Sequence, residues 1–412
     1  MRNAGELPEG ADVVVAGGGV IGLAVARELA RGGAEVVLIE RGEAGAEASW
    51  AAAGMLAPQV EADGADAFFK LAAASRDAYP AFARELEAES GIDIELDRTG
   101  TLYLAFTEED EEECERRFRW QTRAGLRIER LAANEVRALE PRVSARVRSA
   151  LRFPLDGQVE NRRLVAALAK TCAARGVRIV TRTEVGAIKV ESGRATGVET
   201  ERGPVRASSV VVACGAWSSR LRLDVSPARD DDGDGGDDGG GVSPPRTEPV
   251  RGQILCFAPG GGGAQQQQSP PFVRHVIYSP RGYLVPRRDG RLLAGTTTEH
   301  AGFDKFVTGA GREAIRARAR EIAPDVDALV LSDAWAGLRP RGADEWPVLG
   351  ALGGVPNLFY ATGHYRNGIL LAPLTGALVA ALILQRGGVV SPLLEAFTPE
   401  RFQRASPSSC AV

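Results

Sequence analysis

The 412-residue chain has few of the residue types that build metal sites and disulfide frameworks. It contains five cysteines and three histidines, and the cysteines are far apart, with no C-x-x-C pair. Zinc sites need closely grouped ligands, and disulfide scaffolds need paired cysteines in an oxidising compartment. The composition therefore predicts no metal site, no disulfide framework and a reducing environment.

Long apolar runs are also missing. The first ten residues are polar and show no signal peptide. The most apolar stretch, Ile369–Leu384, contains Pro373 and Gly376 and is shorter than the roughly 20 residues that a membrane-spanning helix needs. We predict a buried helix here, no transmembrane segment and a cytoplasmic protein, with peripheral membrane contact as the alternative.

The formal net charge lies close to zero. It is −4 at pH 7, and six aspartates stand within residues 230–238, so removing those six negative charges leaves +2. Neither value gives the strongly basic surface that nucleic-acid binding requires. We therefore predict no nucleic-acid partner.

Two internal stretches and the C-terminal tail lack the apolar residues of a core. Residues 226–246 are rich in Asp, Gly and Pro, and residues 259–271 contain runs of Gly and Gln. Such compositions are typical of disorder, so we predict two disordered insertions and a loose tail over 398–412. The aspartate oxygens would suit calcium, but a solvated linker is the favoured interpretation.

The most informative stretch is residues 11–40, which has the pattern strand, glycine turn, helix, strand. Val13–Ala16 is a short apolar run, Val20–Arg31 has helical periodicity, and Glu40 closes the second strand. The turn between them has the spacing G-x-G-x-x-G, formed by Gly17, Gly19 and Gly22. In this context the motif predicts a dinucleotide site.

Each motif residue has a physical role. Gly17 permits a tight turn, Gly19 lets the backbone approach a pyrophosphate, and Gly22 allows close packing of helix on strand. The helix N-terminus offers free N–H groups to the phosphates. Glu40 is placed to accept hydrogen bonds from ribose hydroxyls. The motif alone leaves FAD and NAD open, and a glycine-rich turn in an ordinary βαβ unit is the alternative.

Apolar periodicity predicts further strands and helices along the chain. The expected strands are residues 101–106, 177–180, 185–190, 195–200, 210–214, 253–257, 276–278, 282–285 and 291–295. The expected helices are residues 66–90, 108–119, 134–139, 161–175, 311–323 and 369–386. The short strands after residue 247 suggest an antiparallel sheet, and 210–214 suggests a return to the parallel sheet.

These elements predict an α/β fold with a discontinuous organisation. A Rossmann-like parallel-sheet domain would comprise residues 1–60, 145–225 and 335–397. An α+β substrate domain with an antiparallel sheet would comprise residues 61–144 and 247–334.

Six motifs together carry a family likeness. They are GGGVIGLAVARELA, SWAAAGMLAP, VVACGAWSS, GYLVPRRDGRLLAGTT, WAGLRP and GHYRNGILLAP. With them the chain resembles the flavin-dependent amine and amino-acid oxidoreductases of the D-amino-acid oxidase type, and within these the glycine-oxidase branch of thiamine biosynthesis. The likeness runs from about residue 11 to about residue 397, with the two insertions as interruptions.

The resemblance implies noncovalently bound FAD. By position, the residues after the glycine turn of Gly17, Gly19 and Gly22, namely Val20 and Ile21, would sit at the pyrophosphate. Glu40, Arg41 and Val185 would sit at the adenosine part, and Ala48, Ser49, Ala53, Gly54 and Met55 beside the flavin. The turn that would close over the isoalloxazine ring comprises His364, Tyr365, Arg366, Asn367, Gly368, Ile369 and Leu370. A helix starting near Gly368 would stabilise negative charge on reduced flavin.

The resemblance also implies a substrate site. Arg339 would bind a carboxylate in a two-point fork, which fits guanidinium chemistry. Arg366 and Tyr283 would be further substrate-side residues. A structural ion pair at Arg339 and a core aromatic at Tyr283 are the alternatives.

The chain departs from the family in places. Arg281 stands where a glycine oxidase can carry histidine, and Thr298 stands where it can carry methionine. A methionine would narrow the pocket, so Thr298 is expected to leave more room. Relatives that tether FAD do so through a C-terminal-half cysteine, and none lies between Cys256 and Cys410.

The resemblance therefore implies an enzyme for oxidative deamination of glycine or another small amino acid or amine. Hydride transfer to flavin and reoxidation by O₂ would give H₂O₂, and the imine would supply thiamine thiazole synthesis. The alternatives are a D-amino-acid dehydrogenase that uses a quinone or carrier, and a nucleotide-binding protein without turnover. The resemblance also suggests a homo-oligomer, which is often a tetramer in this family.

Overall fold

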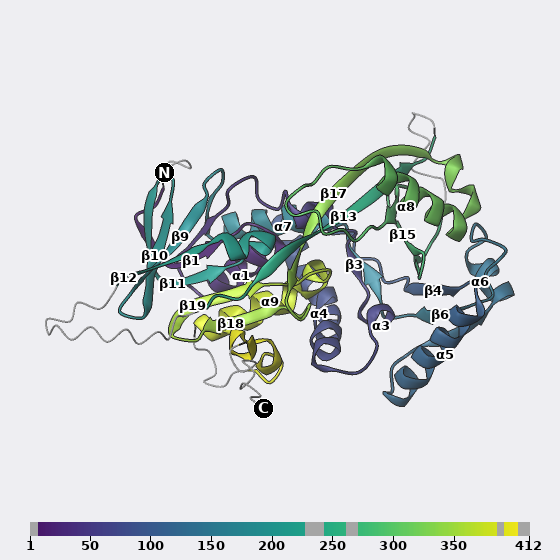
Figure 1. Ribbon diagram of the computed structural model, residues 1–412, viewed down its shortest axis with the longest axis horizontal. Helices are drawn as coiled ribbons and strands as arrows, with labels where there is room; N and C mark the ends of the chain where they lie inside the picture. Colours follow the sequence, from purple (N-terminus) through teal and green to yellow (C-terminus); the bar gives the residue numbers. More distant parts are fainter. Residues whose placement is uncertain (1–6, 227–242, 261–270, 385–390, 403–412) are drawn as a thin grey trace, which may run out of the picture.

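The computed structural model describes residues 7–226, 243–260, 271–384 and 391–402. The described chain forms two large sheets that lie toward opposite ends of the long axis in Figure 1. Two of the predicted low-complexity segments, 226–246 and 259–271, fall largely outside the described residues, as does most of the predicted loose tail. Residues 398–402 of that tail are described and form part of a short 3-10 helix, Pro399–Phe402.

The first sheet has nine described strands and a parallel centre. Its order is β12 (Arg222–Ser226), β9 (Val185–Glu191), β10 (Arg194–Thr200), β11 (Gly203–Val212), β1 (Gly10–Ala16), β2 (Val36–Ile39) and β8 (Arg178–Val180), with β19 (Val355–Thr362) beside β11 and β18 (Val348–Leu352) beside β19. β1 runs parallel to β2 and to β11. The predicted return of the chain to the parallel sheet at residues 210–214 is therefore confirmed, because that segment is the end of β11.

Helices pack over this sheet and share a hydrophobic core with its strands. They are α1 (Val20–Arg31), α4 (Ala67–Ser90), α7 (Asn161–Ala174) and α9 (Gly368–Ile383). α1 is where the glycine motif predicted it, and it packs on α7 and α9. α4 packs on α7 and α9. The valines of β1 alternate between the core clusters on the two faces of the sheet, as expected for a buried parallel strand.

The buried helix predicted at the apolar stretch is confirmed as α9. Pro373 lies inside it and has no N–H for the carbonyl of Ile369. The hydroxyl of Tyr79 on α4 donates a hydrogen bond to that carbonyl, and Ser75 donates to the next one at 2.7 Å. α4 therefore supplies the one donor that the proline withholds, and it gives a further donor to the next carbonyl. No helix of the described chain has the length and apolar character to cross a bilayer.

The second sheet has eight described strands. Its order is β17 (Val330–Gly342), β13 (Thr247–Ala258), β16 (Leu292–Gly295), β15 (Gly282–Pro286), β14 (Val276–Ser279), β4 (Thr101–Ala105), β6 (Ser149–Phe153) and β5 (Glu129–Ala132). The antiparallel expectation holds except where β14 runs parallel to β4. β4 comes from an early, separate part of the chain, so this pair is not a hairpin and its direction is not set by a turn.

Helices and short elements complete this part of the structure. α5 (Glu108–Arg123), α6 (Ala133–Leu139) and α8 (Gly309–Ile322) lie around the second sheet, as Figure 1 shows. The connecting elements are α2 (Ala48–Ala51), β3 (Met55–Leu56), α3 (Pro58–Glu61), β7 (Gly157–Gln158) and the 3-10 helices η1 (Gly215–Arg220), η3 (Pro324–Ala328), η4 (Glu395–Phe397) and η5 (Pro399–Phe402).

The predicted domain boundaries follow the two sheets only in part. β6 and β17 belong to the second sheet. The predicted first domain nevertheless includes residues 145–153 and 335–342, which contain β6 and the second half of β17. β17 is a single long strand through this boundary, and it carries the WAGLRP motif into the space between the sheets. The two-domain division itself stays a prediction.

Candidate active site

One elongated cavity lies between the two sheets and brings together nearly all residues that the sequence singled out. Its wall includes Gly17, Gly19, Val20, Ile21, Glu40, Arg41, Ala48, Ser49, Ala53, Gly54, Met55, Val185, Tyr283, Arg339, His364, Tyr365, Arg366, Asn367, Gly368 and Ile369. These residues come from distant parts of the chain. Two predicted residues, Gly22 and Leu370, are not part of the wall.

The glycine turn shapes the first end of the cavity. Gly17 has φ +107°, and a Cβ there would lie 2.4 Å from the carbonyl oxygen of Ala213. A Cβ at Gly22 would lie 1.9 Å from the carbonyl oxygen of Gly17, so this glycine permits helix–strand packing and does not face the ligand. At Gly19 the nearest atom to an added Cβ is the hydroxyl of Ser49 at 3.3 Å. The backbone of Gly19 is therefore open to a ligand.

The N-terminus of α1 faces this end without a capping side chain from Gly19 and without an acidic residue in its first turn. The N–H of Val20 donates to the Ser49 hydroxyl at 2.9 Å. A helix start without a cap from its own N-cap residue, beside open glycine backbone, offers N–H groups and a positive dipole end to an anion such as a pyrophosphate. The residues present therefore match a dinucleotide at this end.

Glu40 closes β2 beside the glycine turn. Its two carboxylate oxygens accept hydrogen bonds from the N–H groups of Gly18, at 2.8 Å, and Gly42, at 2.9 Å. These bonds fix the carboxylate at the cavity wall, and each oxygen keeps a second lone pair for a ribose hydroxyl.

Arg41 adds a side wall to the part of the cavity beside Glu40. Its guanidinium lies 3.7 Å from the ring centroid of Trp217 and pairs with Glu47 at 2.7 Å. Trp217 belongs to the VVACGAWSS motif but was not predicted as a site residue. Val185, the first residue of β9, lines the same end.

Cys214 is the one described cysteine in the cavity wall. Its thiol donates to the carbonyl of Ala16 at 3.2 Å, and burial raises its pKa to about 12. A protonated, hydrogen-bonded thiol is a poor nucleophile. This environment fits a noncovalently held cofactor.

The turn after β19 and the start of α9 form the opposite end. α9 begins at Gly368, as predicted, and Asn367 provides no side-chain cap. Tyr365 has φ +46°, a left-handed conformation that is uncommon for a residue with a side chain. The carbonyl of Pro340 on β17 accepts the N–H of Tyr365 at 2.8 Å, which holds the turn against the second sheet.

His364 lies in this turn but is buried and faces Thr375, with 3.1 Å between Nε2 and the hydroxyl. Burial lowers its pKa to about 3. The imidazole is therefore neutral at physiological pH and holds the turn in place.

Arg339 belongs to β17 and lines the cavity together with Tyr283 of β15. Its guanidinium donates to the Thr297 carbonyl at 3.1 Å and to the Thr296 hydroxyl at 2.7 Å. Within the described ranges no carboxylate forms an ion pair with it, and burial lowers its pKa. Tyr283 is buried beside it in the same wall, and burial raises the phenol pKa. An arginine whose described partners are both neutral can bind an anion.

Arg366 has a different environment. It pairs with Glu61 on α3 at 2.9 Å and forms no ion pair with another carboxylate among the described residues. Its guanidinium also donates to the Tyr278 hydroxyl at 3.2 Å. The charge of Glu61 raises the pKa of Arg366. Arg366 therefore belongs to the cavity, but its charge is already balanced.

The structure also corrects and extends the predicted set. Thr298 is exposed and outside the cavity wall, so the expectation that it sets the pocket size is wrong; Thr296, two residues earlier, lines the wall. Leu370 lies behind the wall, where its carbonyl accepts the bond from Ser75. Sequence reasoning missed Glu61, Trp217, Gly252 and Thr296. Only Trp217 and Thr296 lay within motifs that the sequence had marked.

Comparison with protein families gives one match across most of the chain. The family described as "FAD dependent oxidoreductase" matches residues 12–382. The chain is 34% identical to glycine oxidase of Pseudomonas aeruginosa over 381 residues, covering 92% of this chain and 96% of that protein. It is 36% identical to a bifunctional protein ThiO/ThiG of Synechocystis over 393 residues, covering 95% of this chain and 54% of that longer protein.

Solved structures give the same picture. The crystal structure of glycine oxidase from Geobacillus kaustophilus superposes with a TM-score of 0.83 and 34% identity, covering 95% of this chain and 98% of that one. The chain therefore shares its fold, over 95% of its length, with a protein of that description.

Proposed function

The chain belongs to the FAD dependent oxidoreductase family, and from this premise we propose that it oxidises glycine or another small amino acid or amine with O₂ as the electron acceptor. The observation that carries the substrate part of this proposal is Arg339. It is a half-buried guanidinium in the cavity wall whose described partners are a carbonyl and a hydroxyl. A small carboxylate would complete its fork of donors.

The chain's own residues would hold FAD along the full cavity. Gly17, Gly19, Val20 and Ile21 would receive the pyrophosphate, Glu40, Arg41 and Val185 the adenosine, and Ala48, Ser49, Ala53, Gly54 and Met55 together with residues 364–369 the isoalloxazine ring. When bound, FAD supplies hydride acceptance and the return of electrons to O₂ as H₂O₂.

The work of the protein is then orientation. Arg339 fixes the substrate carboxylate, and Tyr283 closes the pocket beside it with a neutral hydroxyl. Arg366, balanced by Glu61, bounds the pocket on the side of α3. These contacts hold the Cα–H of the substrate in one place, which is the main contribution that binding makes to such a reaction.

No strong base faces the substrate position among the groups described above. His364 is neutral and bonded to Thr375, and Tyr283 keeps its proton. The substrate amine must therefore be unprotonated when its α-hydrogen leaves as hydride. The resulting imine is released or hydrolyses to the oxo acid and ammonia, and we propose that it supplies thiamine thiazole synthesis.

The test is H₂O₂ release by purified, FAD-loaded protein over a panel of glycine, sarcosine, D-alanine and D-proline. Turnover led by glycine supports the proposal. Turnover led by a D-amino acid keeps the site and moves the substrate. Flavin reduction without H₂O₂ would instead identify a dehydrogenase that uses a quinone or carrier, and no flavin reduction by any member of the panel would refute the proposal. A homo-oligomer stays a prediction, which light scattering of the same sample tests.

A further inference from the structure

The cavity segment Ser49–Gly54 is held from behind by its carbonyl groups. Asn161 donates to the carbonyls of Ser49, at 2.8 Å, and Trp50, at 2.9 Å; Trp335 donates to Ala51 at 3.0 Å; Arg287 donates to Ala53 at 2.8 Å; and the N–H of Val159 donates to Gly54 at 2.9 Å. None of these four donor residues belongs to the cavity wall. The five carbonyls therefore point away from the cavity.

This arrangement fixes the direction of the peptide groups in the wall. The C=O and N–H of one peptide group point in opposite directions, so the N–H groups lie on the other side of the segment from these donors, and those of Trp50 and Ala51 bond to the carbonyl of Glu47. Ala51, Ala52 and Ala53 have only a methyl side chain and Gly54 has none, so the side chains alone contribute little to the shape of the segment. Its shape depends on the groups behind it.

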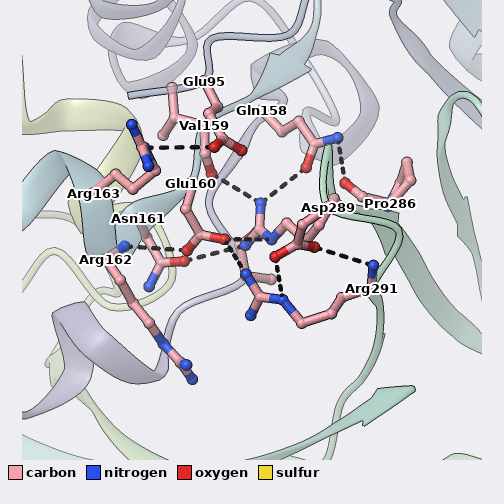
Figure 2. A network of polar contacts seen from close by, with 12 residues as sticks. Glu95, Gln158, Val159, Glu160, Asn161, Arg162, Arg163, Pro286, Asp289 and Arg291 are labelled. Atoms are coloured by element: carbon pink, nitrogen blue, oxygen red, sulfur yellow. Dashed lines mark hydrogen bonds and ion pairs between the residues drawn. The ribbon is translucent and has the colours of Figure 1, made fainter. Parts of the chain in front are cut away.

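Arg287 connects most of these groups. One terminal nitrogen donates to Ala53 and, at 3.1 Å, to the Asn161 side-chain oxygen. The other donates to the Gln158 side chain and to the Val159 carbonyl, both at 2.9 Å. Figure 2 shows Gln158, Val159, Glu160 and Asn161 side by side in this network. Arg287 thus holds Ala53 directly and orients both residues that hold Ser49, Trp50 and Gly54.

The charge of Arg287 is balanced without a free anion. The side chain is buried, with 4% of the residue exposed, and its Nε lies 3.3 Å from the carboxylate of Glu160. Arg291 reaches the same carboxylate at 3.0 Å but is not bonded to segment 49–54. Four neutral acceptors around one planar guanidinium require its fork of donors, which a lysine amine cannot reproduce.

We propose that Arg287 is a positioning residue for the cofactor: it fixes segment 49–54 in the conformation that contacts the flavin, although it does not touch the cavity itself. This inference rests on the family's use of FAD and not on the identity of the substrate. It predicts that changing Arg287 alters how tightly, and in what environment, the flavin is held.

The test measures the rate at which FAD leaves diluted holoenzyme, from the recovery of free FAD fluorescence, together with the shape of the visible flavin band. Arg287→Lys keeps the charge and removes the fork. Arg291→Gln is the matched control, because it removes a partner of Glu160 and leaves every bond to segment 49–54. Asn161→Asp is an isosteric second variant that replaces the donor to two carbonyls with an acceptor.

We expect FAD to dissociate at least tenfold faster from Arg287→Lys and from Asn161→Asp, with a shifted flavin band, and within twofold of the wild-type rate from Arg291→Gln. Circular dichroism establishes that each holoenzyme is folded. The proposal is overturned if folded Arg287→Lys releases FAD within twofold of wild type, or if Arg291→Gln equals it. If Arg287→Lys does not fold, the same thresholds apply to Asn161→Asp. Because the readout is FAD retention, it is independent of whether glycine is turned over.

Discussion

Replacement of Arg339 separates a substrate-binding arginine from a structural one. Within the part of the chain that the structure describes, its guanidinium bonds to the Thr297 carbonyl and the Thr296 hydroxyl and to no carboxylate. A bound carboxylate would add two charge-assisted hydrogen bonds, each worth about 1.5–3 kcal/mol. Arg339→Met removes both, so the loss is about 3–6 kcal/mol of transition-state stabilisation. At about 1.36 kcal/mol per factor of ten, kcat/KM for glycine should fall roughly 10²- to 10⁴-fold.

The same change should leave stability nearly intact. Burial lowers the pKa of Arg339, which means that folding disfavours its charged form. Methionine has a similar length and no charge, and replacing a buried charge that lacks a carboxylate partner by an apolar side chain is close to neutral or stabilising. The free energy of unfolding of Arg339→Met should therefore stay within about 1 kcal/mol of wild type.

The assay is a peroxidase-coupled measurement of H₂O₂ on FAD-loaded enzyme over a range of glycine concentrations, with urea unfolding of the same preparations. Arg339→Lys keeps the charge without the fork and should fall between the other two. A folded Arg339→Met with kcat/KM within tenfold of wild type would refute the carboxylate assignment. A loss of several kcal/mol in stability would show instead that Arg339 holds the fold together.

Three further predictions test other parts of the site. Thr296→Met should reduce kcat/KM for glycine at least tenfold because Thr296 lines the cavity, whereas Thr298→Met on the exposed surface should stay within twofold; equal effects would contradict this placement. Ser49→Ala removes the acceptor for the first N–H of α1 and should lower the free energy of unfolding in urea by about 1 kcal/mol, and a change below about 0.3 kcal/mol would show that the bond contributes little. His364 has a folded pKa of about 3 against an ordinary 6.5, so the unfolded state takes up the proton first as pH falls, and stability is lost between these values. His364→Gln should flatten Tm against pH from about 6.5 down to 4, and an unchanged slope in that range would contradict the neutral, buried imidazole.

The predictable part of the site was the part encoded by short spacings. Gly17, Gly19, Glu40 and the start of α9 follow from patterns within about thirty residues, because local turns and helix starts impose them. The boundaries of α1 were recovered for the same reason. The predicted helix 369–386 corresponds to α9, which begins one residue earlier and ends at Ile383, and residues 385–386 lie outside the described residues.

The rest depends on contacts between distant segments. Glu61 balances Arg366 across 305 positions, and no spacing rule predicts such a pair. Thr298 was placed in the pocket by the family resemblance, which puts a methionine in a strand at about this position, but the regular strand β16 ends at Gly295. Beyond that residue, strand alternation no longer determines which threonine faces the cavity, and it is Thr296 that does.

The domain boundary predicted near residue 335 stays a prediction, although it falls within a continuous strand. A composition change or a turn can mark the end of a domain, but β17 continues through this point as one strand from Val330 to Gly342. Its register with β13 is set by pairing over its whole length, which the local sequence does not reveal.

The close packing of α1 on α9 fixes the two helices against each other. A Cβ at Gly376 on α9 would lie 2.8 Å from the carbonyl oxygen of Ala24 on α1, so the two helices cannot slide or separate without opening a tight contact. Residues at both helix N-termini line the cavity. In the proposed placement of FAD, α1 would receive a phosphate and α9 the isoalloxazine ring, and a mononucleotide flavin carries both groups. The helix pair therefore sets a spacing that the two flavins share, and the choice of FAD over FMN would rest on Glu40 and Arg41, which only the adenosine of FAD would reach.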